Sequence, residues 1–147
     1  MIVNSLNIVF EAGDLQRVVS KLAGEVDKLK ELTVSLEPGT MLLSGKVSVG
    51  LSIPFVTKWQ ARVRDEGRAA GLTLTGCSVA MMGMGEEMIS TQVLSLLSKK
   101  LEGHDSVRIE GKEIIVDLHP ALSQRGITLN APLTKLEISP SGILLEA

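Results

Sequence analysis

The sequence predicts a single domain of α+β class, residues 1–147, in which a strongly curved antiparallel β-sheet wraps around helices. Two segments place apolar residues at the helical period, and several others alternate apolar and polar residues at the strand period. Short turns that contain glycine, proline or aspartate separate the alternating segments. The order of helix and hairpin occurs twice, which predicts two β-α-β-β type halves and a weak internal repeat over about residues 7–53 and 79–118.

In the first half, a short strand over residues 7–10 precedes a helix over residues 15–29, for which Asp14 is the expected N-cap. The apolar stripe of this helix consists of Leu15, Val18, Val19, Leu22, Val26 and Leu29. A turn at residues 37–40 leads into one long strand over residues 41–53, whose alternate side chains are apolar. Because this length exceeds that of a usual strand, we expect its glycines to mark bends.

In the second half, strands over residues 57–64 and 72–82 flank a turn at residues 65–67, and the apolar phase shifts near Gly76, which predicts a β-bulge. The helix over residues 88–101 has a broader apolar face than the first helix, as is typical of a helix surrounded by sheet. Two further hairpins complete the chain, one over residues 107–118 and one formed by residues 133–138 and 143–145.

The composition argues against several function classes. Aromatic residues make up only 2% of the chain and methionine occurs six times, so the interior is expected to be aliphatic and adaptable. A net charge of −2 argues against a nucleic-acid binder. The single Cys77 excludes an internal disulfide, and together with His104 and His119 it forms no metal-binding spacing. His104, Asp105 and Ser106 are adjacent in the chain, so their side chains point in different directions and do not form a catalytic triad. We therefore expect no catalytic residue, and the spacings above predict no metal or cofactor.

Five passages carry a family resemblance. They are Leu-Leu-Ser-Gly-Lys-Val at residues 42–47, Ile-Pro-Phe at 53–55, Trp-Gln-Ala-Arg-Val at 59–63, Gly-Ile-Thr-Leu at 126–129, and the closing segment 133–147. With them, residues 32–147 resemble the bacterial LmeA-like proteins of the tubular lipid-binding (TULIP) type. The resemblance implies a curved antiparallel sheet around a long helix, with lipid acyl chains held in the groove between them. It also implies an exported or envelope-anchored protein.

The candidate site is an apolar groove between the second helix and the sheet. The residues expected to line it are Met81, Met84, Met88, Val93, Leu94, Leu97, Val47, Val49 and Trp59. Methionine thioethers beside glycines could gate such a groove, or they could simply fill the core. Trp59 could be a ligand wall or a core residue. Lys58, Arg62 and Arg64, together with Arg68, would suit anionic headgroups and a peripheral membrane contact, or they could form a solvated sheet face that discourages aggregation.

The sequence therefore predicts a non-catalytic protein that binds or carries an apolar ligand, with lipid acyl chains as the expected ligand. The alternative is a structural or assembly module without a ligand, which dimerises or docks a protein partner through an exposed strand edge or its aliphatic face. The sequence as it stands contains no signal peptide or transmembrane segment, so the expected compartment is the cytoplasm. Removal of a leader would instead make an envelope-associated protein the expectation.

Overall fold

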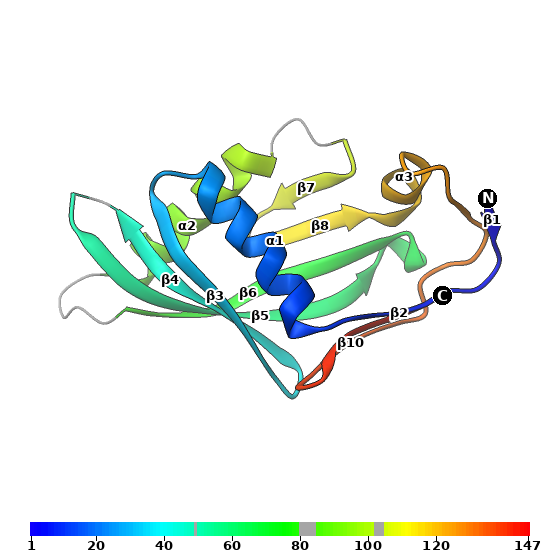
Figure 1. Cartoon of the computed structure of the whole chain (residues 1–147), viewed down its shortest axis with the longest axis horizontal. Helices are drawn as coiled ribbons and strands as arrows, with labels where there is room; N and C mark the ends of the chain where they lie inside the picture. Colours follow the sequence, from blue (N-terminus) through cyan, green and yellow to red (C-terminus); the bar gives the residue numbers. More distant parts are fainter. Residues whose placement is uncertain (49, 80–84, 102–104) are drawn as a thin grey trace.

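A six-stranded antiparallel sheet forms the centre of this α+β protein (Figure 1). The computed structural model describes residues 1–48, 50–79, 85–101 and 105–147. The sheet order is β3-β4-β5-β6-β8-β7 and the sheet does not close on itself. Its strands are β3 (Leu29–Glu37), β4 (Thr40–Ser48), β5 (Ser52–Arg64), β6 (Ala69–Val79), β7 (Val107–Glu110) and β8 (Glu113–Asp117). The predicted fold class and the antiparallel arrangement are confirmed.

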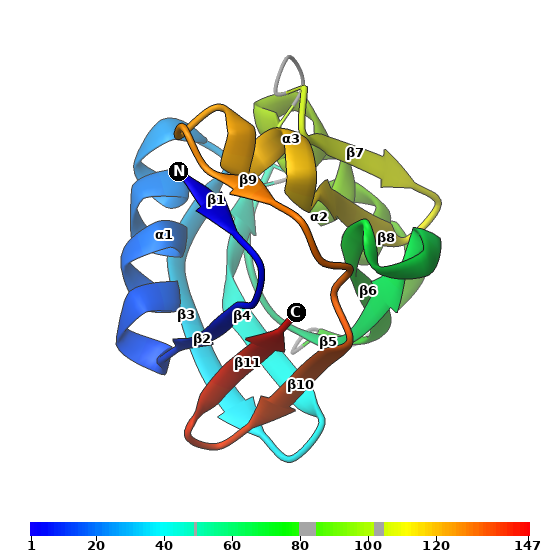
Figure 2. The same ribbon diagram turned by 90° about the vertical axis from the view of Figure 1, so that its right-hand side faces the viewer.

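Two smaller sheets connect the chain ends to the rest of the protein. The first joins β2 (Asn7–Phe10), β10 (Lys135–Ser139) and β11 (Gly142–Glu146) in the order β10-β11-β2. The second is a parallel pair of β1 (Ile2–Val3) and β9 (Thr128–Leu129), which lie side by side in Figure 2. The strand at residues 7–10 and the last hairpin agree with the prediction. The β1–β9 pair and the short helix α3 (Leu118–Ser123) were not predicted.

Helix α1 (Ala12–Glu25) begins three residues before the predicted start. The backbone N–H of Glu11 donates to Asp14 Oδ2 at 3.0 Å, so Asp14 lies inside the first turn and its prediction as the N-cap is wrong. Val18 is 66% exposed, whereas the rest of the predicted stripe within α1 packs against the core. Leu29 is buried, but it begins β3 instead of ending the helix.

The side chain of Gln16 covers the edge of β3. Gln16 Nε2 donates to the carbonyl oxygen of Leu32, and the backbone N–H of Val34 donates to Gln16 Oε1, both at 2.8 Å. The amide therefore makes the two hydrogen bonds that a neighbouring strand would make. Edge pairing with another chain at this point of β3 would require Gln16 to leave.

The predicted long strand over residues 41–53 is wrong, because the chain reverses direction within it. Ser48 pairs with Ser52, and Pro54 lies inside β5 opposite Lys46. The reversal leaves the apolar alternation intact, since Val47 and Ile53 face each other and are both fully buried. Gly50 supplies the positive φ of +89° that this turn uses.

The β-bulge predicted near Gly76 is confirmed. The pairing of β5 with β6 moves from Lys58–Gly76 to Trp59–Leu74, so Thr75 is the extra residue. The turn predicted at residues 65–67 is a single 3₁₀ turn with positive φ values at Asp65, Glu66 and Gly67.

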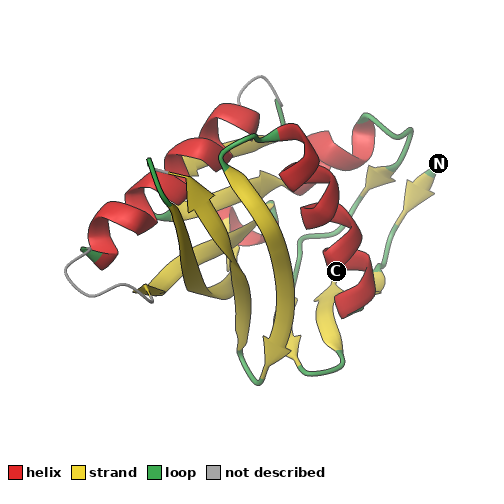
Figure 3. Ribbon diagram, turned by 60° about the vertical axis from the view of Figure 1, so that its left-hand side comes forward, coloured by secondary structure: helices red, strands yellow, loops and turns green. Residues whose placement is uncertain are grey.

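Helix α2 (Glu86–Leu101) carries the broad apolar face that the sequence predicts. Its buried residues are Ile89, Ser90, Val93, Leu94, Leu96 and Leu97. The apolar side chains among them share one core cluster with residues of β3, β4, β5, β6, β10 and β11, and α1 packs against the same cluster. Figure 3 shows the helices beside the strands of the sheet. Each half of the chain thus has a helix followed by a hairpin, while the internal repeat itself stays a prediction. Within the described residues, every helix is too short or too polar to cross a membrane.

Candidate functional site

Five of the residues predicted to line the apolar groove belong to the buried core cluster. Val47, Trp59, Val93, Leu94 and Leu97 are each 9% exposed or less. Met88 is different, because 51% of it is exposed near the start of α2. Met81, Met84 and Val49 lie outside the described residues, and so does the predicted methionine gate apart from Met88. The structure therefore places these five residues of the predicted groove in one buried cluster.

The polar atoms of this core form a short chain of hydrogen bonds. Trp59 Nε1 donates to Thr57 Oγ1 at 2.8 Å, and Thr57 Oγ1 donates to the carbonyl oxygen of Leu43 at 2.8 Å. Thr57 is fully buried and Trp59 is 1% exposed. Because a buried indole N–H needs an acceptor, Thr57 explains how the only tryptophan of the chain sits in a largely aliphatic interior.

A cavity of about 200 Å³ lies between the first turns of α2 and the bulge of β6. We call it the α2–β6 cavity; it is lined by Leu74, Thr75, Gly76, Cys77, Glu86, Glu87, Ser90 and Lys112. Small side chains at Gly76 and Ser90 leave this space unfilled, while Leu74 also belongs to the core cluster. Lys112 Nζ and Glu87 Oε2 form an ion pair at 3.0 Å.

The thiol of Cys77 lines this cavity and is held in its protonated form. Burial raises the pKa of Cys77 above its ordinary value, and the carboxylates of Glu86 and Glu87 raise it further. Lys112 acts in the opposite direction and has the smallest effect of these groups. A thiol with a raised pKa is a poor nucleophile at neutral pH.

Two of the predicted headgroup residues are already paired with an acidic side chain. Arg62 contacts both carboxylate oxygens of Glu113, with Nε 2.7 Å from Oε2, and Arg64 contacts Oε1 at 2.9 Å. Thr73 Oγ1 donates to the same carboxylate, whose side chain is only 8% exposed. Gly71 makes room for it, since a methyl group there would overlap Glu113 Oε2. Lys58 takes part in none of the ion pairs among the described residues.

Hydrogen bonding to Arg62 lowers the pKa of Glu113 below its ordinary value. Burial acts against this effect, and Thr73 and the charges of both arginines add to it. Arg108 extends the charged cluster to Glu110 and Asp65, each at 2.6 Å. The sequence analysis identified Arg62 and Arg64 as basic but missed these acidic partners. Most of the partners come from the β7–β8 hairpin, which is far from both arginines in the sequence.

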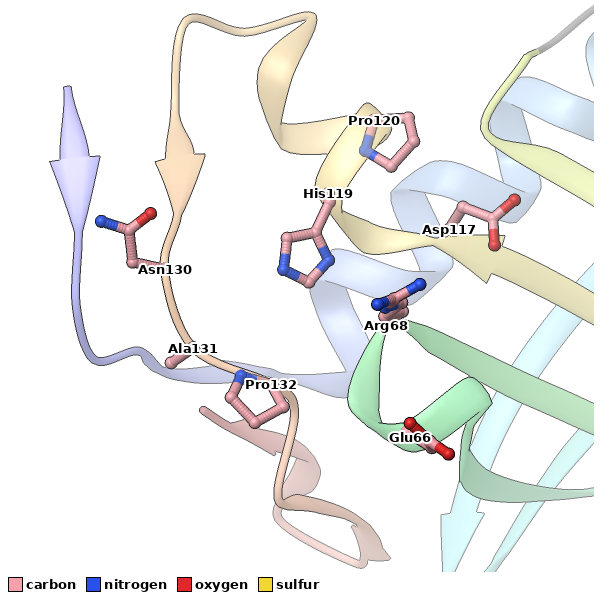
Figure 4. A pocket seen from close by; sticks show the side chains of 8 residues that line it. All are labelled: Glu66, Arg68, Asp117, His119, Pro120, Asn130, Ala131 and Pro132. Carbon is pink, nitrogen blue, oxygen red and sulfur yellow. The ribbon is translucent and has the colours of Figure 1, made fainter.

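A larger cavity of about 600 Å³ lies where three separate segments meet (Figure 4). We call it the Arg68–His119 cavity; it is lined by Glu66, Arg68, Asp117, His119, Pro120, Asn130, Ala131 and Pro132. Two backbone hydrogen bonds hold its walls together. The N–H of Leu133 donates to the carbonyl of Gly67 at 2.7 Å, and the N–H of Leu118 donates to that of Arg68 at 3.0 Å.

Two local features shape this cavity. Gly67 has a φ of +90°, and a Cβ there would lie 2.6 Å from Pro132 Cβ, so glycine is needed for the close approach of the two walls. The Nδ1 atom of His119 is buried and has no hydrogen-bond partner among the described residues. The sequence prediction considered His119 only as a metal ligand, and no group of metal-binding side chains is found in the described part of the chain.

No protein-family model, curated protein or solved structure matches this chain. Conclusions about function therefore depend on the residues and the geometry described above.

Proposed function

We propose that this protein binds an apolar ligand between α2 and the six-stranded sheet, with a lipid acyl chain as the expected ligand and no reaction catalysed. The α2–β6 cavity carries this proposal, because Leu74 lines the cavity and also belongs to the core cluster of α2 and the sheet. Leu74 is the aliphatic side chain among residues that are mostly polar or charged, so an acyl chain that enters there would contact Leu74. Burial of each methylene would contribute about 0.8 kcal/mol to binding.

The volume of the α2–β6 cavity limits how much of a ligand can enter it. A volume of about 200 Å³ is below the range of roughly 300–1,000 Å³ that is typical of ligand pockets, so it accommodates only the end of a chain. Deeper insertion requires α2 to separate from β6, so that Val93 and Leu97 contact the ligand in place of their present neighbours. The proposal also includes a sheet curved around α2, as in the TULIP-type proteins that the sequence resembles. It further includes contacts to the ligand headgroup from Lys58, Arg62 and Arg64, to which we add Lys112.

Native mass spectrometry with saturated fatty acids of eight, ten and twelve carbons tests the proposal. We expect 1:1 adducts whose affinity rises about three- to fourfold with each added methylene. Cys77 offers a second measurement, because a chain in the α2–β6 cavity covers its thiol and slows alkylation by iodoacetamide. Ser90→Met should fill the cavity and weaken binding about tenfold, the equivalent of one to two buried methylenes.

Ser95→Met is the matched control, since Ser95 is an exposed residue of the same helix and should leave affinity unchanged. Affinity independent of chain length, or an alkylation rate that dodecanoate does not alter, would overturn the proposal.

The alternative function, an assembly module, is favoured by one specific observation. β2 is an edge strand of the three-stranded sheet, and its apolar residues Val9 and Phe10 are 50% and 40% exposed. If this edge pairs with a second copy of the chain, sedimentation velocity should show a dimer at micromolar concentration. Val9→Lys should then weaken the dimer at least about tenfold, because two buried valines are lost. Val18→Lys on the exposed face of α1 should not change it, and a monomer at every concentration would exclude this alternative.

A further inference from the structure

We propose that the Arg68–His119 cavity is a binding site for a small organic anion, separate from the apolar site and independent of the proposed function. The carboxylate or other oxyanion of the ligand would pair with the guanidinium of Arg68 beside the imidazole ring of His119. The apolar body of the ligand would pack against Pro120, Ala131 and Pro132, which line the same cavity. Four observations support this site.

The first observation is that the cavity is large and already formed. Its volume of about 600 Å³ lies within the usual range of small-molecule pockets, roughly 300–1,000 Å³. The hydrogen bonds from Leu133 to Gly67 and from Leu118 to Arg68 connect all three wall segments through backbone atoms. A ligand would therefore bind without the cost of first ordering these segments.

The second observation concerns charge. Arg62, Arg64 and Arg108 all form ion pairs, whereas none of the ion pairs among the described residues includes Arg68. Two carboxylates also line the cavity, but neither is paired with Arg68. Asp117 lies 3.7 Å from Arg108 Nε and points away from His119, and Glu66 is exposed at the outer margin (Figure 4). The guanidinium of Arg68 is thus available to an anion from solution.

The third observation is the unpartnered His119 Nδ1 atom. A buried polar atom without a hydrogen bond costs about 1–3 kcal/mol, and native proteins have few of them. In Figure 4 the imidazole ring projects into the space between Arg68 and the segment from Asn130 to Pro132. Protein atoms cover Nδ1 itself, so a bound anion would reach it only after a rotation of the ring that opens it to the cavity.

The fourth observation is strain in the wall. Asp65 and Glu66 have φ values of +52° and +58°, which are unfavourable for residues other than glycine. Such residues concentrate at ligand sites, where the surrounding structure maintains them. Here Arg108 holds Asp65 at 2.6 Å, and Glu66 is the next residue in the cavity wall.

NMR of protein labelled with ¹⁵N at histidine tests the site directly, with acetate, benzoate and inorganic phosphate as probes. The chain has two histidines, so the ring signals are assigned with a His119→Gln variant. We expect benzoate to shift the Nδ1 resonance of His119 in a saturable manner. Benzoate should bind at least about tenfold more tightly than acetate, because only its ring can pack against Pro120 and Pro132.

Arg68→Gln should weaken benzoate binding at least about tenfold, as expected for the loss of a charged hydrogen-bond partner. Arg125→Gln is the matched control, since Arg125 is exposed and does not line the cavity. Thermal melting confirms that both variants stay folded, and Arg68→Lys should restore part of the affinity. The proposal is overturned if no probe gives a saturable shift at His119. It is also overturned if both arginine variants weaken benzoate equally, or if phosphate and acetate bind as tightly as benzoate.

Discussion

Replacement of Trp59 by alanine is expected to lower the free energy of unfolding by about 3–5 kcal/mol, the range for large buried aromatic residues. Trp59 is 1% exposed at the centre of the core cluster, so its removal leaves a cavity among Leu, Val and Ile side chains. The substitution also removes the N–H that Thr57 Oγ1 accepts. Urea unfolding followed by far-UV circular dichroism measures the effect, because the variant has lost the only tryptophan.

The conservative variant Trp59→Phe separates packing from hydrogen bonding. Phenylalanine retains much of the ring volume, and Thr57 Oγ1 can still donate to the carbonyl of Leu43, so the expected loss is about 1–2 kcal/mol. A loss below about 1 kcal/mol for Trp59→Ala would contradict the assignment of Trp59 to a filled core. It would favour instead the interpretation of Trp59 as the wall of a ligand site, where little packing is lost.

Replacement of Glu113 by glutamine is expected to destabilise the protein by about 1–3 kcal/mol at neutral pH. The carboxylate is 8% exposed and accepts hydrogen bonds from Arg62, Arg64 and Thr73. Arg62 itself is 61% exposed, so water screens part of its contribution, and the value is lower than for a fully buried pair. Urea unfolding at low ionic strength gives the difference between the two proteins.

The pH dependence of this difference follows from the lowered pKa of Glu113. An unfolded glutamate has a pKa of about 4.3, so the ionised carboxylate stabilises the folded protein fully above that pH. As the pH falls through the lower folded-state pKa, the carboxylate becomes protonated and this stabilisation is lost. The difference between the wild type and Glu113→Gln should therefore be largest above about pH 5 and should shrink towards zero in stronger acid.

Glu110→Gln provides the comparison, because Glu110 contacts Arg64 and Arg108 but is 51% exposed. Exposed ion pairs contribute about 0–1 kcal/mol, so its effect should be small at every pH. Equal effects of Glu110→Gln and Glu113→Gln would show that burial of Glu113 has no energetic consequence. A difference between the wild type and Glu113→Gln that persists unchanged in acid would contradict the pKa argument.

The elements that the sequence predicts correctly have strong local signals. The apolar periods of α1 and α2 and the turn residues of the hairpins lie within a few residues of one another along the chain. The long strand over residues 41–53 was predicted wrongly for a physical reason. An antiparallel reversal between Ser48 and Ser52 preserves the alternation, so one strand and a hairpin have the same pattern.

Short elements held by distant partners could not be predicted locally. α3 and the β1–β9 pair have too few residues for a periodic pattern, and the pair depends on bonds such as that from Thr128 N–H to the carbonyl of Met1. The charged cluster and the Arg68–His119 cavity also depend on residues that are distant in the sequence. Arg62 was identified as basic, but its partner Glu113 is 51 residues away in the chain. The walls of the Arg68–His119 cavity come from three separate segments.

The sequence by itself determined the α+β class, both long helices, most of the hairpins and an interior of aliphatic side chains, because periodicity and turn chemistry are local properties. Only the tertiary structure decided which of these side chains fill the core, as Val93 and Trp59 do, and which stay exposed, as Met88 and Val18 do. It also decided that Arg62 and Arg64 are paired while Arg68 faces a cavity beside His119. Burial and pairing depend on contacts between distant segments, which no local pattern encodes.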